Sequence, residues 1–115
     1  MVNGSGIGND SAVPARAIAA LLHRARREPA LACLLEGLAR PGTSGTLKGR
    51  MHDTPAEGLF RGKTGTGEGA VALSGVCGPF VMSVLVEHMK SRRDDVRAAL
   101  DACAIVLSTL AREAP

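Results

Sequence analysis

Two apolar runs joined by a two-residue connection constrain the fold more than any other feature of this sequence. The first run extends from Ala70 to Cys77 and the second from Phe80 to His88, so only Gly78 and Pro79 separate them. Both runs are rich in β-branched residues, which favour strands. Strands that follow each other so closely are joined by a tight antiparallel turn. The sequence therefore predicts a β-hairpin.

Further elements are predicted on both sides of this hairpin. A third strand is expected from Gly58 to Thr66. A helix is expected after Lys90, and its apolar residues at helical spacing would cover one face of the three strands. That apolar set consists of Val96, Ala99, Leu100, Cys103, Val106, Leu107 and Leu110.

The N-terminal part of the chain has helical periodicity. Ser11 could cap an amphipathic helix that Pro29 interrupts, and a second short helix is expected from about Ala30 to Ala39. We therefore expect an α+β fold, in which a three-stranded antiparallel sheet carries the C-terminal helix on one face and has the N-terminal helices beside it. Residues 1–115 would form one partial domain rather than several.

Composition excludes several classes of protein. Hydrophobic residues make up 45% of the chain, but no apolar run approaches the ~18 residues of a membrane span. The net charge of +3 could suggest a nucleic-acid binder. The arginines are scattered, however, and Phe60 and Phe80 are the only aromatic residues, so no stacking platform is present. We expect neither a membrane span nor a nucleic-acid partner.

The cysteines and histidines have no spacing typical of a metal site or a disulfide framework. Cys33, Cys77 and Cys103 are far apart and lie in apolar contexts, which favours buried small side chains. The three histidines form no His-Glu-x-x-His motif and pair with no cysteine at zinc-ligand spacing. No metal and no cofactor are therefore expected.

The run from Arg61 to Gly69 combines one lysine, two threonines and four glycines. Gly62-Lys63-Thr64 matches the end of a phosphate-binding loop, but Glu57 stands where that motif needs its first glycine. A phosphate loop must also open a helix, and the glycines that follow disfavour one. A nucleotide-phosphate binder is therefore the weakest of the functional hypotheses.

If the run from Arg61 to Gly69 forms a strand instead of a loop, its residues can bind a different kind of ligand. On a strand, Lys63 and Gly65 share one face and Thr64 takes the other. A lysine beside a hydroxyl can hold a carboxylate through charge-assisted hydrogen bonds, and free backbone N–H groups can pair with an extended peptide or an oxyanion. The motif by itself is equally compatible with an exposed strand lysine between solvated threonines.

Several segments, in the same order along the chain, resemble the penicillin-binding D-alanyl-D-alanine carboxypeptidase/endopeptidase family, serine enzymes with a β-lactamase/transpeptidase-like fold. The matching segments are Asn3-Gly4-Ser5-Gly6-Ile7, Val13-Pro14-Ala15-Arg16, Gly45-Thr46-Leu47 with Met51, Lys63-Thr64-Gly65-Thr66, Ala72-Leu73-Ser74-Gly75 and Met82-Ser83-Val84-Leu85-Val86. The resemblance covers almost the whole chain.

The resemblance implies roles for a few residues. Lys63 and Thr64 would anchor the terminal carboxylate of the substrate, and Lys63 would also support proton transfer. Thr66 would lend its backbone N–H to the oxyanion hole, and Gly65 would leave room for the peptide. Ser5 lies in a glycine-rich family motif, although a plain loop serine fits it equally well. The implied partners are peptidoglycan peptides ending in D-Ala-D-Ala and, in a completed enzyme, β-lactam antibiotics.

Two elements of this chemistry are missing from the sequence. No serine lies three residues before a lysine, and no serine lies two residues before Asn3 or Asn9. The nucleophile and general base of a Ser-x-x-Lys and Ser-x-Asn enzyme are therefore not in this chain. We expect it to correspond to the C-terminal part of the domain and to be inactive alone. The family implies a place of action in the periplasm or cell envelope, but no export signal is present in these residues.

A second hypothesis remains open. The chain could be a non-enzymatic remnant or binding module that recognises peptide carboxylates or a protein partner through an exposed sheet edge.

Overall fold

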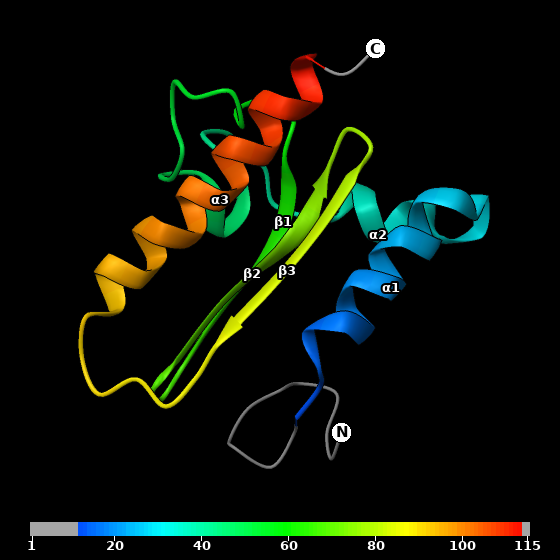
Figure 1. Cartoon of the computed structure of the whole chain (residues 1–115). Helices are drawn as coiled ribbons and strands as arrows, with labels where there is room; N and C mark the ends of the chain where they lie inside the picture. Colours follow the sequence, from blue (N-terminus) through cyan, green and yellow to red (C-terminus); the bar gives the residue numbers. More distant parts are fainter. Residues whose placement is uncertain (1–11, 114–115) are drawn as a thin grey trace.

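A sheet of three antiparallel strands forms the centre of the molecule (Figure 1). The computed structural model describes residues 12–113. The strands β1 (Arg61–Gly67), β2 (Ala70–Cys77) and β3 (Phe80–Val86) lie in the order β1-β2-β3. Both connections are short turns that contain a glycine at positive φ, Gly69 at 67° and Gly78 at 53°. The predicted α+β fold and its antiparallel sheet are confirmed.

Three strand boundaries differ from the prediction, and the smallest difference is at the end of the first strand, which lies at Gly67 rather than Thr66. The first strand begins at Arg61 rather than Gly58, because the backbone N–H groups of Leu59 and Phe60 both donate to the carbonyl of Ala56 and hold that stretch in a turn. The third strand ends at Val86 rather than His88. His88 has φ of 61°, which lies outside the β region.

The helix α3 (Arg93–Glu113) covers one face of the sheet, as predicted. Beneath it lies the core, which includes buried residues of both β2 and β3. Leu73 and Val71 of β2 are almost completely buried, and Met82 of β3 is 7% exposed. Leu100 and Ala104 are the α3 residues buried against them. This core fixes the distance between helix and sheet.

The predicted apolar face of α3 was partly wrong. Ala104 and Ser108, which lie outside the predicted set, are completely buried, whereas Val106 and Leu110 are 57% and 47% exposed. Ala99 and Cys103 are exposed as well. The helix carries two apolar stripes. The stripe that contains the small residues Ala104 and Ser108 is the one that packs against β2. Periodicity alone does not reveal which of two stripes meets the sheet.

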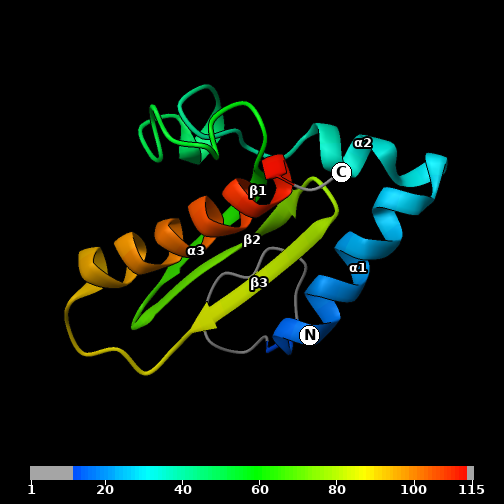
Figure 2. The same ribbon diagram turned by 45° about the horizontal axis from the view of Figure 1, so that its top comes forward.

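The helix α1 (Ala15–Arg27) packs on the opposite face, against β3 and β2 (Figure 2). Leu22 and Ala25 are buried there, whereas Leu21 is 51% exposed. The guanidinium of Arg26 donates to the carbonyl oxygens of Gly78 and Pro79, at 2.6 and 2.9 Å. The helix is therefore attached to the β2–β3 turn by hydrogen bonds as well as by packing.

The second N-terminal helix is shorter than predicted. In place of one helix from Ala30 to Ala39, a 3-10 turn (Pro29–Leu31) precedes the helix α2 (Ala32–Glu36). Helical structure stops before Gly37, and the backbone of Ala39 is used instead to pair with Gly62. Pairing with the sheet thus ends the helix earlier than its leucine spacing indicates.

The segment between α2 and β1 has little regular structure but contributes to the core. It contains one 3-10 turn (Gly45–Leu47), and Leu47, Ala56 and Phe60 are completely buried. The segment packs beside β1 and under α3, so it positions the outer edge of β1.

The cysteines only partly match the prediction. Cys77 is buried, but Cys33 and Cys103 are exposed, so the expectation of buried side chains was wrong for those two. All three are free thiols. Within residues 12–113, no helix is long and apolar enough to cross a membrane.

Candidate functional site

The strand β1 forms one edge of the sheet and carries the Lys63–Thr66 run. At its start, the N–H and carbonyl of Gly62 both pair with Ala39, at 2.8 and 2.9 Å, on the side away from β2. Backbone direction alternates along an antiparallel strand. The N–H and carbonyl groups of Thr64 and Thr66 therefore also face away from β2, toward the outer edge.

Lys63 lies on the exposed side of this edge strand. It pairs in register with Ser74 of β2, and its ammonium group donates to the carbonyl oxygen of Thr64 at 2.6 Å. Its side chain is exposed, which leaves the other two N–H donors of the ammonium group available. The lysine charge thus sits beside the outward-facing backbone of the strand.

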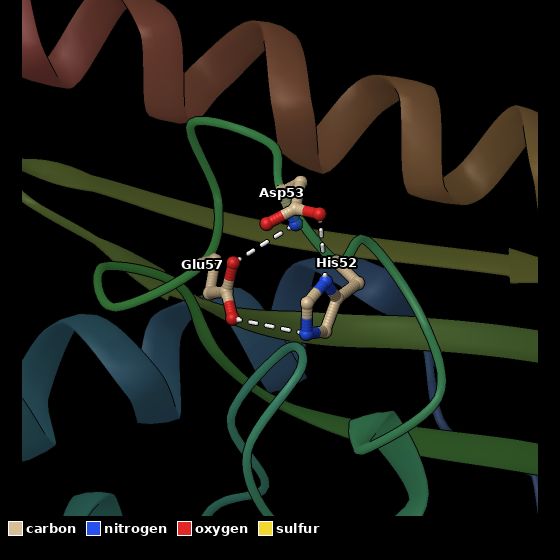
Figure 3. A group of neighbouring side chains, drawn as sticks. All are labelled: His52, Asp53 and Glu57. Carbon is tan, nitrogen blue, oxygen red and sulfur yellow. Dashed lines mark hydrogen bonds and ion pairs between the residues drawn. The ribbon is translucent and has the colours of Figure 1, made fainter.

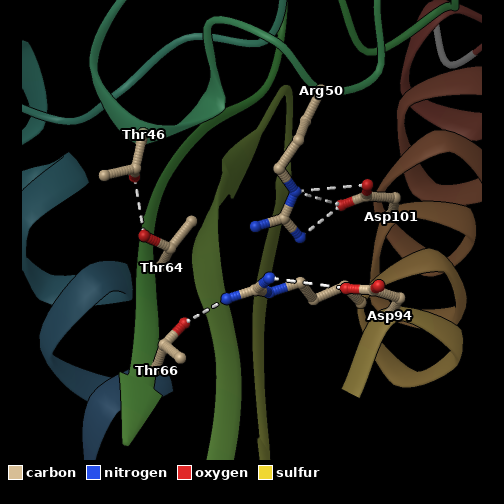
Figure 4. A network of polar contacts seen from close by, with 7 residues as sticks. Thr46, Arg50, Thr64, Thr66, Asp94 and Asp101 are labelled. Carbon is tan, nitrogen blue, oxygen red and sulfur yellow. Dashed lines mark hydrogen bonds and ion pairs between the residues drawn. The ribbon is translucent and has the colours of Figure 1, made fainter. Parts of the chain in front are cut away.

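Thr64 and Thr66 lie on the other face of β1, toward α3, and the strand alternation predicted this opposite face for Thr64. The hydroxyl oxygens of Thr64 and Thr46 are 2.6 Å apart. The hydroxyl of Thr66 accepts a hydrogen bond of 3.0 Å from the guanidinium of Arg97, which also pairs with Asp94 (Figure 4). Both threonine hydroxyls are therefore held by side chains from other elements.

Two of these contacts were missed by sequence reasoning. Thr46 belongs to the Gly45-Thr46-Leu47 segment, which matches the family pattern but carries no role predicted from the sequence. Arg97 lies on the polar side of α3 and is 31 positions away from Thr66 along the chain. Nothing in the local pattern around Arg97 indicates that contact.

Gly65 faces the neighbouring strand closely. A Cβ atom at Gly65 would lie 3.2 Å from the Cβ of Ala72, its register partner on β2. The contact shows that the absence of a side chain here serves the packing of the two strands. Ser5, the remaining candidate, lies outside the described residues.

A shallow, mainly basic depression lies at the far end of β1, beyond Gly67. It is formed by the β1–β2 turn, the segment before α3 and the first turns of that helix. The lining residues are Glu68, Gly69, Met89, Lys90, Ser91, Arg92, Arg93, Asp94 and Arg97. Four basic side chains against two acidic ones give this region a positive potential that favours anions.

A separate polar cluster lies in the loop before β1 (Figure 3). The imidazole of His52 contacts Asp53 at 3.1 Å and Glu57 at 3.7 Å, and the N–H of Asp53 donates to Glu57 at 2.9 Å. Such donor groups could in principle ligate a metal ion. Both ring nitrogens already face a carboxylate, however, and His52 and Asp53 are 61% and 87% exposed. We interpret the cluster as a set of local contacts that hold this loop in one conformation.

The phosphate-loop hypothesis conflicts with the structure. Gly62, Lys63 and Thr64 lie inside β1, which continues to Gly67 and turns directly into β2. Within residues 12–113, the element that directly follows them is the strand β2 and not a helix, so no helix N-terminus faces a phosphate at this position. These three residues therefore do not form a phosphate-binding loop, and their geometry gives the nucleotide-phosphate hypothesis no support.

Comparison with known proteins finds related sequences. The model of the D-Ala-D-Ala carboxypeptidase 3 (S13) family matches residues 1–104. A D-alanyl-D-alanine carboxypeptidase from Actinomadura sp. (strain R39) is 39% identical over an alignment of 83 residues that covers 67% of this chain. The matched part is 15% of the length of that relative. The match over residues 1–104 shows that the chain belongs to the D-Ala-D-Ala carboxypeptidase 3 (S13) family.

Proposed function

We propose that residues 1–115 are the C-terminal portion of a serine-type D-alanyl-D-alanine carboxypeptidase domain that acts on peptidoglycan stem peptides. In this proposal the chain supplies the substrate-anchoring strand, and the Ser-x-x-Lys and Ser-x-Asn elements come from another segment. The chain alone is inactive, because a carboxypeptidase of this type needs a serine nucleophile and a lysine base that this sequence lacks.

The observation that supports this proposal most is the arrangement of β1. Lys63 is exposed, Thr64 and Thr66 carry hydroxyls on the side facing α3, and their backbone groups face the outer edge. An edge strand of this kind can pair with an extended peptide while a cation and hydroxyls bind its carboxylate.

Each residue has a role in this proposal. Lys63 and Thr64 approach the terminal carboxylate from opposite faces of the edge strand, and Lys63 supports proton transfer to and from the missing serine. The N–H of Thr66 stabilises the oxyanion that forms when the serine attacks the carbonyl. Gly65 keeps β1 free of bulk beside the peptide. β-Lactam antibiotics would acylate the same completed site.

The coding DNA upstream of Met1 and a fluorescent penicillin together test the proposal. We expect no covalent labelling of the isolated chain. We expect labelling when the chain is joined to an upstream segment that encodes both missing elements, and loss of that labelling in Lys63→Ala. Lys48→Ala is the matched control, because Lys48 is also an exposed lysine but lies outside β1. Labelling of the isolated chain would contradict the proposed division of the active site.

A second candidate function uses the same edge without catalysis. The outward backbone of β1 and the nearby cationic side chains would also suit a module that binds peptide carboxylates. Unrelated DNA upstream of Met1, together with saturable binding of a D-Ala-D-Ala peptide to the isolated chain, would favour this alternative. Binding that is lost when the carboxylate is amidated would assign the recognition to the peptide terminus.

A further inference from the structure

The start of α3 is attached to the end of β1 through arginine side chains. Arg97 donates to the hydroxyl of Thr66 at 3.0 Å, and Arg93, one turn earlier, donates to the carbonyl of Gly67 at 3.2 Å. The side chain of Arg97 is 35% exposed and is also steered by Asp94, whose carboxylate lies 3.6 Å away. The helix thus reaches the hydroxyl of the last threonine on the candidate strand (Figure 4).

This contact decides what the Thr66 hydroxyl can do. An arginine is always charged and can only donate, so it occupies an acceptor lone pair of the threonine oxygen. The proton of the hydroxyl must then be donated elsewhere. Among residues 12–113, Arg97 is the side chain that hydrogen-bonds this hydroxyl. The Thr66 hydroxyl is therefore oriented to donate its proton to a group other than Arg97. The positive charge of Arg97 polarises this hydroxyl.

A donor of this kind suits a carboxylate, which accepts hydrogen bonds and cannot donate them. A threonine hydroxyl without such a partner could rotate between donating and accepting a hydrogen bond. Part of the free energy of ligand binding would then be lost in ordering this hydroxyl. The basic depression at this end of β1 adds attraction for an anion. The geometry therefore links Arg97 to anion recognition without requiring that it touch the ligand.

We propose that Arg97 is a positioning residue: it holds the Thr66 hydroxyl as a hydrogen-bond donor for the C-terminal carboxylate of a peptide on β1. This inference rests on the proposed function, because it takes the peptide carboxylate as the ligand. It goes beyond the strand motif, because it assigns a role in carboxylate recognition to a residue of the C-terminal helix.

Titration of the isolated chain by NMR tests the inference. The two probes are N-acetyl-D-alanyl-D-alanine and its C-terminal amide. Scalar couplings of Thr66 report in parallel whether its side chain keeps one rotamer. We expect the unmodified chain to prefer the carboxylate probe and Arg97→Ala to lose that preference about tenfold, as its Thr66 rotamer averages. Arg97→Lys should restore only part of it, because an ammonium group lacks the planar fork of a guanidinium.

Arg92→Ala is the charge-matched control. It removes one positive charge from the same depression, but Arg92 pairs with Asp95 rather than with β1. We expect it to change the preference less than about twofold, since its side chain is well exposed. An equal loss in Arg92→Ala and Arg97→Ala would assign the effect to net charge and overturn the positioning role.

The remaining outcomes separate this inference from the proposed function. If the unmodified chain prefers the carboxylate and Arg97→Ala keeps both the preference and the Thr66 rotamer, the inference is wrong and the proposed function stands. If the unmodified chain binds neither probe, carboxylate anchoring by this chain fails. The proposed role of Arg97 in carboxylate recognition is then overturned as well, whatever the Thr66 rotamer does.

Discussion

Arg50 and Asp101 form a two-pronged ion pair that joins the loop before β1 to the middle of α3. The Nε atom of Arg50 lies 3.2 Å from both carboxylate oxygens, and one terminal nitrogen lies 2.6 Å from Oδ1. Both side chains are only 20% exposed, so solvent screens the pair weakly. The pair therefore helps hold the segment that flanks the candidate strand.

The first prediction concerns this pair. Asp101→Ala leaves a partly buried guanidinium without its partner, so we expect the free energy of unfolding to fall by about 1–3 kcal/mol. Urea unfolding of both single variants and the double variant would give the coupling energy. The exposed pair Arg24–Glu28 serves as the control, with an expected coupling below about 0.5 kcal/mol. Equal coupling energies for the two pairs would contradict this role of burial.

The second prediction concerns the orientation of α3. Leu100 is 3% exposed and Leu110 is 47% exposed, although both were predicted to face the sheet. Leu100→Ala should lower the unfolding free energy by about 2–4 kcal/mol, because it opens a cavity in the core. Leu110→Ala should cost less than about 1 kcal/mol. Chemical denaturation measures both, and a reversed order would mean that the other stripe of the helix faces the sheet.

The third prediction concerns Ser108, whose hydroxyl is fully buried and, although it lies near the Cys77 thiol, makes no hydrogen bond of good geometry within residues 12–113. A buried hydroxyl of this kind has lost its bonds to water. Ser108→Ala should therefore raise the unfolding free energy by about 1 kcal/mol, and the melting temperature with it. Thr109→Ala is the neighbouring control, because the Thr109 hydroxyl is exposed and bonds to Ile105. Destabilisation of Ser108→Ala would indicate that the hydroxyl has a partner.

The fourth prediction concerns the pH dependence of stability. Burial raises the pKa of the Cys77 thiol above its ordinary value of 9.0, while the nearby Ser108 hydroxyl and the Arg26 charge oppose the shift. The folded chain thus keeps its proton at a pH where the unfolded chain releases it. This stabilisation is complete below the unfolded pKa and is lost as the pH rises through it toward the folded pKa.

Denaturant unfolding at several pH values would measure that loss. We expect the unfolding free energy of the native sequence to decrease from about pH 9 upward. Cys77→Ala should show a smaller decrease over the same range, because the titrating thiol is gone. Identical pH profiles for the two proteins would show that this thiol does not contribute.

The fifth prediction concerns the close contact between β1 and β2. A Cβ atom at Gly75 would lie 2.2 Å from the carbonyl oxygen of Arg61, whereas one at Gly67 would meet nothing within 4 Å. Gly75→Ala should therefore destabilise the chain by more than about 3 kcal/mol or prevent folding. Gly67→Ala should stay within about 0.5 kcal/mol. Circular dichroism and urea unfolding would compare the two, and tolerance of Gly75→Ala would refute the close packing.

The sheet could be predicted from the sequence because its signals are local. The short Gly78-Pro79 turn between two runs rich in β-branched residues specifies the β2–β3 hairpin without reference to the rest of the chain. The face of α3 could not be predicted in the same way. Leu100 and Leu110 both satisfy helical spacing, and the choice between them depends on how closely Ala104 and Ser108 let the helix approach β2.

The candidate site was also only partly predictable. Strand alternation is a local property, so it correctly predicts Lys63 and Thr64 on opposite faces of β1. The contacts of Thr66 with Arg97 and of Thr64 with Thr46 join segments that are far apart in the sequence, at separations of 31 and 18 residues. Such contacts follow from tertiary packing, which no local pattern encodes.

The bridge between Ala39 and Gly62 limits the length of any chain that adds to β1. It occupies the first outward-facing position of the strand, and the strand ends at Gly67. Thr64 and Thr66 are then the two outward positions that remain for pairing. An extended polypeptide could lay only a few residues along this edge before it met the segment around Ala39. The free part of this edge therefore suits the end of a peptide. A long strand could not pair along the whole of β1.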